Sequence, residues 1–152
     1  MSKILVAFRD YLLSLGHKVI DINADELNIG SNLVIIKSDF MFKEKKEAYF
    51  ETKNLNCVLN TYSFYLDNLM PKKFTVDLEN NDFNVSDSPN KTLNLKFDKT
   101  SCLGEARNKD YLILSKKDSN ENIFGSIKDI NIVGQYTDIV CDILFKFVSR
   151  KA

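Results

Sequence analysis

The chain of 152 residues has no tryptophan, one histidine, two prolines, five glycines and three cysteines. The cysteines, Cys57, Cys102 and Cys141, are far apart, and none forms a C-x-x-C pair. This spacing is not that of a zinc site or a disulfide framework, and it indicates buried or free thiols in a reducing compartment. The single histidine, His17, cannot build a zinc site without other converging ligands.

An excess of charge of either sign is also lacking, because Lys and Arg total 21 and Asp and Glu total 21. This balance argues against broad, non-specific binding of nucleic acid, and the alternative is a local basic patch. No apolar run approaches the roughly 20 residues that span a bilayer. The segment Met1-Ser2-Lys3 also leads into an amphipathic pattern unlike a secretory signal. We therefore expect a cytoplasmic protein without a membrane span.

What the chain does contain is the composition of an ordinary globular protein, with 44% apolar and 28% charged residues. Eleven Phe and six Tyr supply bulky core side chains. Since no linker or low-complexity segment interrupts the pattern, we expect one domain over residues 1–152.

Three segments have helical periodicity. Residues 3–15 place Ile4, Phe8, Tyr11, Leu12 and Leu15 on one face, with Gly16 as a left-handed stop. Residues 55–69 and 136–148 also repeat apolar side chains at helical spacing.

Strands are predicted between these helices, at residues 17–22, 32–42, 47–53, 73–78, 92–98, 110–117 and 120–127. This order predicts an α+β fold, a mixed β-sheet with an N-terminal, a central and a C-terminal helix packed on it.

The stretch KSDFMFKEKKEAYFETKNL, residues 37–55, carries the best-defined candidate chemistry. Two apolar runs flank the charged residues KEKK. This pattern predicts a hairpin that bends about Lys45. Asp39 then opposes Glu51, and Lys53 shares their face because side chains alternate along a strand. A register shift of one residue would separate the two carboxylates.

Two directly opposed carboxylates repel each other unless a cation lies between them. Mg²⁺ suits such a pair, since it takes hard oxygen ligands and retains several waters. Lys53 beside the ion would orient a metal-bound water or stabilise developing negative charge. The alternative is an ordinary edge hairpin whose charges keep other strands away. Acid-x-Lys triplets are common in so charged a chain, and Glu44-Lys45-Lys46 is another.

The segments FRDYLLSLGHKVI and SDFMFKEKKEAYFETKN together resemble the restriction-endonuclease-like, PD-(D/E)xK nuclease superfamily. The resemblance covers residues 4–60 with a motif and residues 104–127 by pattern only. It implies Asp39 and Glu51 as Mg²⁺ ligands, the Thr52 carbonyl as a third ligand, and Lys53 as the residue that positions the attacking water. The implied reaction is phosphodiester hydrolysis in DNA, with RNA as the less favoured substrate.

The chain departs from the superfamily pattern in three places. Ser38 stands where the motif usually has proline, and the first helix offers Asp10 but no glutamate at the accessory acidic position. Residues 72–99 form an insertion-like β region without a counterpart in the pattern.

A competing hypothesis is a small non-enzymatic interaction protein, such as an immunity protein, an inhibitor or a phage-type antagonist, that binds a protein partner. Neutral charge, modest length and loops rich in Asn and Lys suit this function equally well. Even a nuclease-like fold is compatible with it, because fold does not determine function.

Overall fold

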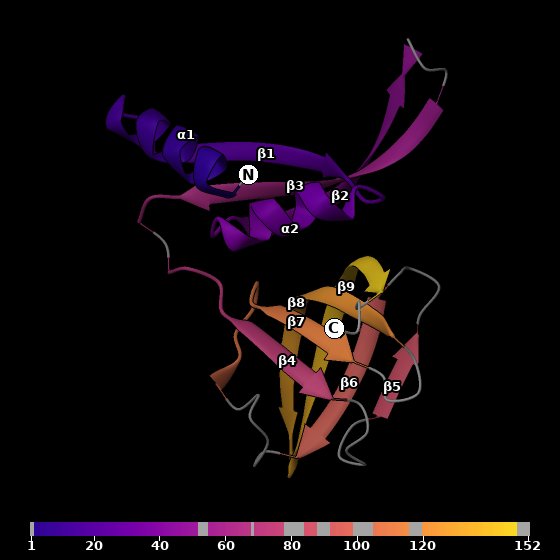
Figure 1. The fold of residues 1–152 in the computed structure, drawn as a ribbon. Coiled ribbons are helices and arrows are strands. Elements are labelled where there is room, and N and C mark those ends of the chain that lie inside the picture. The colour runs from indigo at the N-terminus through magenta and orange to yellow at the C-terminus, as the bar shows by residue number, and fades with distance from the viewer. Residues whose placement is uncertain are drawn as a thin grey trace. The chain divides into compact units, whose positions relative to one another are not determined.

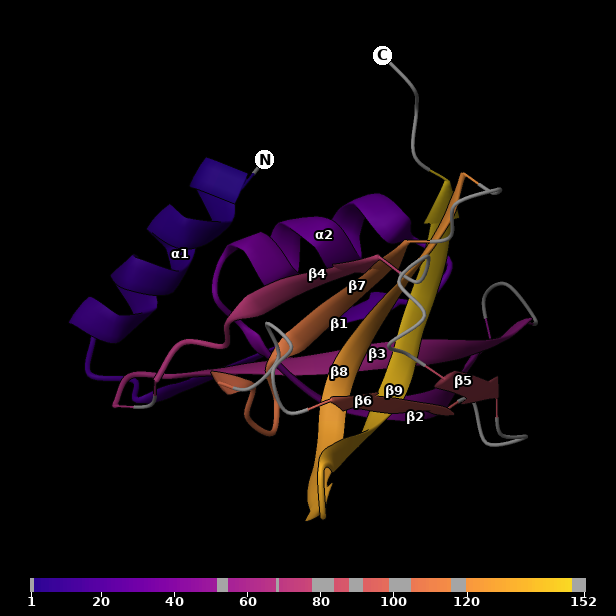
Figure 2. The same cartoon turned by 90° about the horizontal axis from the view of Figure 1, so that it is seen from below.

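A computed structural model describes residues 2–51, 55–67, 69–77, 84–87, 92–98, 105–115 and 120–148. The chain divides into two compact units, Met1–Pro71 (unit 1) and Lys72–Ala152 (unit 2), which we describe separately. The expectation of a single domain stays a prediction. Figures 1 and 2 trace the described elements from two directions. These are α1 (Ser2–Ser14), β1 (Val19–Asp25), α2 (Ile29–Lys37), β2 (Met41–Phe50), β3 (Leu55–Tyr65), β4 (Lys73–Asp77), β5 (Asn84–Asp87), β6 (Thr92–Asp98), β7 (Tyr111–Ser115), β8 (Glu121–Val133) and β9 (Tyr136–Val148).

Unit 1 contains α1, α2 and a three-stranded antiparallel sheet in the order β1-β3-β2. The helix predicted at residues 3–15 is confirmed, and Gly16 has φ +98 as expected of a left-handed stop. The strand predicted at residues 17–22 is confirmed as β1.

The strand predicted at residues 32–42 is wrong over most of its length, because Ile29–Lys37 form α2. The Asn28 side chain accepts a hydrogen bond from the Ser31 N–H at 3.1 Å and so caps the helix start. A short apolar run such as LVII fits a buried helix as well as a buried strand, and the cap favours the helix.

The central helix predicted at residues 55–69 is also wrong, since Leu55–Tyr65 form the middle strand β3. This segment is rich in aromatic and β-branched residues, which favour strands. Both faces of β3 are buried from Asn60 to Phe64, and Val58 and Leu59 interrupt the alternation of polar and apolar residues along it. Its aromatic side chains pack against β2 and the turn before it, with ring centroids 5.7 Å apart for Phe40–Phe64 and 5.9 Å apart for Phe42–Tyr62.

Unit 2 is a six-stranded sheet in the order β4-β7-β8-β9-β6-β5. β4 runs parallel to β7, and the other neighbours are antiparallel. The strands predicted at 73–78, 92–98, 110–117 and 120–127 are confirmed, although β8 extends further, to Val133. The long β8–β9 hairpin turns at Gly134, whose φ is +61. The hydrophobic core of unit 2 consists of Val76, Leu93, Leu95, Leu112, Leu114, Ile123, Ile127, Ile139 and Cys141.

The C-terminal helix predicted at residues 136–148 is wrong, because this segment is β9. Thr137, Ile139 and Cys141 alternate toward the buried side, as a strand requires. Together with the apolar residues between them, they also match the spacing of a helical face. The β-branched side chains of this segment favour the strand. The fold is therefore α+β, but with two sheets and without the predicted central and C-terminal helices.

Candidate functional site

The structure does not bring the predicted metal ligands together. Asp39 lies in the turn between α2 and β2, with φ +67, and Glu51 follows the last residue of β2. A ten-residue strand separates them, which at about 3.3 Å per residue is a distance on the order of 30 Å. Asp39 instead lies near Arg9, with Oδ2 4.0 Å from Nη1. Thr52 and Lys53 lie outside the described residues.

The hairpin predicted about Lys45 is wrong because β2 runs straight through that position. Lys45 pairs with Asn60 of β3, and a bulge between Phe42 and Glu44 lets the strand continue without a turn. The partner strand of β2 is thus β3, not residues 47–53. Asp39 and Glu51 cannot share one Mg²⁺ ion in this arrangement, since such ligands must lie within about 2.1 Å of the ion. Among the described residues, no group of three or more His, Cys, Asp or Glu side chains is placed to hold a metal.

The face of α1 defined by Ile4, Phe8, Tyr11 and Leu15, which we call the α1 stripe, is exposed. The exposed fractions of these residues are 71, 56, 58 and 58%. The opposite side of the helix is half-buried and holds Leu5, Val6, Arg9, Leu12 and Leu13. Helix α1 therefore has two apolar faces, and only one of them is used within the described chain.

Arg9 fixes the orientation of α1. Its guanidinium lies 4.4 Å from the centroid of the Phe64 ring, and its Nη1 donates to the Ser38 carbonyl at 2.6 Å. A cation over an aromatic ring is attracted by the ring quadrupole, and the hydrogen bond fixes the direction of approach. Arg9 thus connects α1 to β3 and to the end of α2, with the α1 stripe directed away from them.

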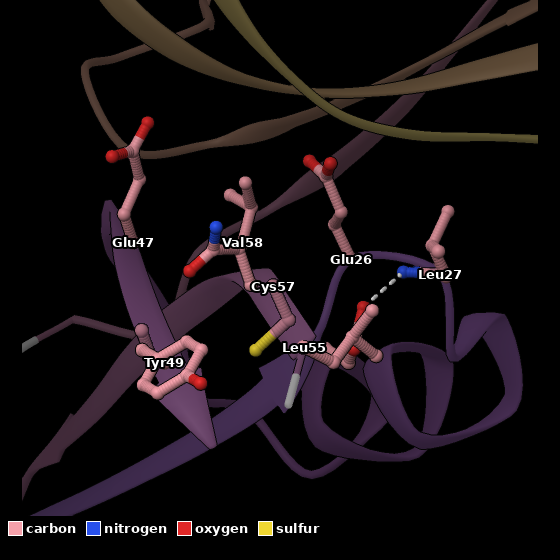
Figure 3. Close-up of a pocket in the computed structure, with 10 residues that line it drawn as sticks. Glu26, Leu27, Glu47, Tyr49, Leu55, Cys57 and Val58 are labelled. Atoms are coloured by element: carbon pink, nitrogen blue, oxygen red, sulfur yellow. Dashed lines mark hydrogen bonds between the residues drawn. The ribbon is translucent and has the colours of Figure 1, made fainter. Parts of the chain in front are cut away.

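A second surface feature is a pocket of about 570 Å³ (the ribbon pocket), located where β1 ends and the β2–β3 ribbon continues. Figure 3 shows the side chains of this pocket. It combines carboxylates with partly exposed apolar groups, a lining that can bind a ligand with both basic and apolar parts. The residues that line it are Asp25, Glu26, Leu27, Glu47, Ala48, Tyr49, Leu55, Asn56, Cys57 and Val58.

A buried polar network holds the elements around this pocket. Asn32, fully buried, donates from Nδ2 to the carbonyls of Asp25 and Asn28, both at 2.8 Å. Its Oδ1 accepts from Asn60 Nδ2 at 3.0 Å and from the Tyr62 hydroxyl at 2.6 Å. All four hydrogen-bonding positions of the amide are therefore occupied. Burial raises the pKa of the Tyr62 hydroxyl, so this group remains a proton donor at neutral pH.

The network continues to the pocket rim through Lys45. Its Nζ donates to Asn60 Oδ1 and to Glu26 Oε2, both at 2.9 Å. The Lys45–Glu26 pair is about one-fifth exposed on each side. One of the pocket carboxylates is thus already neutralised.

The helical spacing identified Ile4, Phe8, Tyr11 and Leu15 as one face but did not show that this face is exposed. Leu12, predicted on the same face, lies on the half-buried side instead. Leu5, Val6, Leu12 and Leu13 form a second apolar face, and the sequence does not show which face packs inward. The ribbon pocket was missed altogether, because its residues come from three segments of which one was predicted as a helix.

Neither described helix is long and apolar enough to cross a membrane. The resemblance to the PD-(D/E)xK nucleases stays a prediction. No protein-family model, curated protein or solved structure matches this chain.

Proposed function

We propose that this protein is a non-enzymatic interaction protein that binds a partner protein through the α1 stripe. The observation that carries the proposal is the continuous exposure of Ile4, Phe8, Tyr11 and Leu15 on a helix that is already fixed by its other face. Large side chains each bury about 150–250 Å². At exposed fractions near six-tenths, the stripe presents on the order of 400 Å² of apolar surface. Patches of this size on a monomer are often functional.

The spacing of the stripe favours a helical partner. Its residues are separated by four, three and four positions, the pattern by which one helix packs against another. Burial of about 400 Å² contributes roughly 10 kcal/mol at 25 cal/mol/Å². Association itself costs about 4–15 kcal/mol. The stripe alone therefore leaves at most about 6 kcal/mol, and micromolar affinity, about 8 kcal/mol, requires further contacts with the partner.

A different protein suits the stripe better than a second copy of this chain. Two copies that met through their stripes alone would bury on the order of 800 Å² in total. This area is below the ~1,000 Å² of a specific interface. A different protein can exceed it, because it can add contacts outside the stripe. We therefore assign the stripe to an amphipathic helix or helical groove of another protein.

The predicted nuclease activity receives no support from the positions of Asp39 and Glu51, and the restriction-endonuclease-like arrangement also remains a hypothesis. A direct assay separates the two functions. Purified protein is incubated with plasmid and with single-stranded DNA, with Mg²⁺, with Mn²⁺ and with chelator. Metal-dependent cleavage that Glu51→Ala or Lys53→Ala abolishes would establish the enzyme and overturn the proposal.

The binding proposal is tested by a photo-crosslinking amino acid placed at Tyr11. The crosslinked protein is identified, purified and titrated against the unmodified chain. We expect Phe8→Asp to weaken its binding at least tenfold, because a charge at the centre of the interface loses its hydration. Lys3→Asp places the same negative charge at an exposed position about 110° around the helix from the centre of the stripe, and should change the affinity far less. Equal affinities of wild type and Phe8→Asp would disprove the role of the stripe.

A further inference from the structure

The β2–β3 ribbon continues past the end of β1. β1 ends at Asp25, opposite Leu59, whereas β2 pairs with β3 up to the Phe50–Leu55 pair. Leu55–Val58 therefore have a neighbouring strand on the β2 side only, and no described strand pairs with them on the other side. Figure 1 shows the ribbon extending beyond β1 as a two-stranded arm.

The backbone of this segment has the hydrogen-bonding pattern of an open sheet edge. The Glu26 N–H donates to the Val58 carbonyl at 2.9 Å, so the main chain of Val58 faces the side that β1 occupies further along. Main-chain groups two residues apart in a strand face the same side, which places the N–H and C=O of Asn56 on this edge too. An incoming strand would continue the line of β1 and bond to Asn56.

The exposed side chains of the arm show that a third strand would cover apolar surface. Leu55, on the edge strand itself, is 53% exposed, and Leu27, in the turn after β1, is 84% exposed. A two-stranded hairpin is only marginally stable in water without a further strand or a packed face. The ribbon pocket lies next to this edge and includes all of Leu55–Val58 in its lining.

The negative charge of the ribbon pocket determines which extended peptide segments can bind at this edge. Asp25, Glu26 and Glu47 line it, and no lining residue is basic. Because Lys45 neutralises Glu26, the remaining charge is about two negative units. Complementary charge is attracted and like charge is repelled at such a surface. A second copy of this chain, pairing through the same edge, would bring two acidic pockets together and is therefore disfavoured.

We infer that the edge of β3 at Leu55–Val58 binds an extended, basic segment of another polypeptide as an added β-strand. The main-chain bonds supply affinity, the apolar residues around Leu55 receive alternate side chains, and Glu47 and Asp25 select lysine or arginine. This site is separate from the α1 stripe and depends on different residues, so either proposal can fail while the other stands.

The test uses a fluorescent ten-residue peptide of alternating lysine and valine, titrated with the full chain by fluorescence anisotropy. A peptide of alternating glutamate and valine tests charge. A third peptide, N-methylated at two adjacent central residues, loses one N–H donor on each edge and tests strand addition. We expect binding of the first peptide at least tenfold tighter than that of the other two. Equal binding of the N-methylated peptide, or no binding of the lysine peptide at millimolar concentration, would overturn the inference.

Variants of the protein locate the site. Glu47→Lys should weaken binding of the lysine peptide about tenfold, equivalent to about 1.4 kcal/mol. Glu44→Lys, at an exposed glutamate of the same strand outside the pocket, is the matched control and should change affinity far less. Phe8→Asp should have no effect, since it alters only the α1 stripe. Equal effects of Glu47→Lys and Glu44→Lys would show that the peptide responds to overall charge and would refute the site.

Alkylation of Cys57 gives an independent readout. This residue lines the pocket, and its rate of reaction with iodoacetamide can be followed separately by peptide mass spectrometry. We expect a saturating concentration of the lysine peptide to slow alkylation of Cys57 severalfold. An unchanged rate with the peptide bound would place the peptide elsewhere and contradict the inference.

Discussion

Replacement of Asn32 by alanine should be among the most damaging single changes in unit 1. The Asn32 amide makes four hydrogen bonds, to the carbonyls of Asp25 and Asn28 and from the side chains of Asn60 and Tyr62. A typical intramolecular hydrogen bond contributes about 0.5–1.5 kcal/mol net, and an unsatisfied buried partner costs about 1–3 kcal/mol. Because Asn32 is fully buried, water cannot replace the lost contacts without entering the interior. We expect Asn32→Ala to lower the free energy of unfolding by about 4 kcal/mol.

The assay is urea denaturation followed by circular dichroism, with Tyr62→Phe and Asn131→Ala measured in parallel. Tyr62→Phe removes one of the four bonds and should cost about 1 kcal/mol. Asn131 is exposed in β8, and its replacement should cost less than about 0.5 kcal/mol. The double variant of Asn32 and Tyr62 should be less destabilised than the sum of the single variants, because both remove the same bond. A loss below 1 kcal/mol for Asn32→Ala would refute the saturated network.

Three further predictions concern pH, the β4–β7 connection and the attachment of α1. Burial raises the pKa of the Cys141 thiol from 9.0 to about 12, and the nearby charge of Asp142 adds to this effect. The contribution of Cys141 to stability should therefore be complete below pH 9 and decrease as the pH rises toward 12. Thermal melts should show this decrease, and Cys141→Ala should reduce the dependence of the melting temperature on pH. Asp110→Ala should cost about 2–4 kcal/mol in urea denaturation, because the buried carboxylate accepts the N–H groups of Lys72 and Arg107, both at 2.9 Å; a value near zero would show that water satisfies both donors. Arg9→Ala should lower the free energy of unfolding by roughly 1–2 kcal/mol. Arg9→Lys should lower it by a similar amount, since an ammonium cannot reproduce the stacking of a planar guanidinium. Equal melting temperatures of wild type and Arg9→Lys would contradict this prediction.

The elements that the sequence predicts correctly have one clear local signal each. α1 has an apolar face followed by Gly16, and β6 alternates Leu93 and Leu95 with polar residues. β7 is a short apolar run between charges, which fits a strand covered on both faces. Local rules were sufficient in these segments because propensity and burial favour the same structure.

The elements that were predicted incorrectly are β3 and β9, which were expected to be helices, and α2, which was expected to be a strand. In β3 and β9, apolar residues also occupy helical positions, and only the neighbouring strands determine the outcome. The predicted pairing of Asp39 with Glu51 was wrong because it also depended on contacts between distant segments. The alignment of Asp39 with Glu51 required a turn near Lys45, but pairing of Lys45 with Asn60 keeps β2 extended. A long-range contact of this kind has no local signal in the sequence.

The place of β9 within its sheet determines when unit 2 can form during synthesis. β9 lies between β8 and β6, so β6 and β5 have no connection to the rest of the sheet until residues 136–148 have left the ribosome. The strands of unit 1, in contrast, are complete once Tyr65 has emerged. A nascent chain halted between these points therefore carries a paired N-terminal sheet followed by strands with open edges, which are the features that chaperones protect from aggregation.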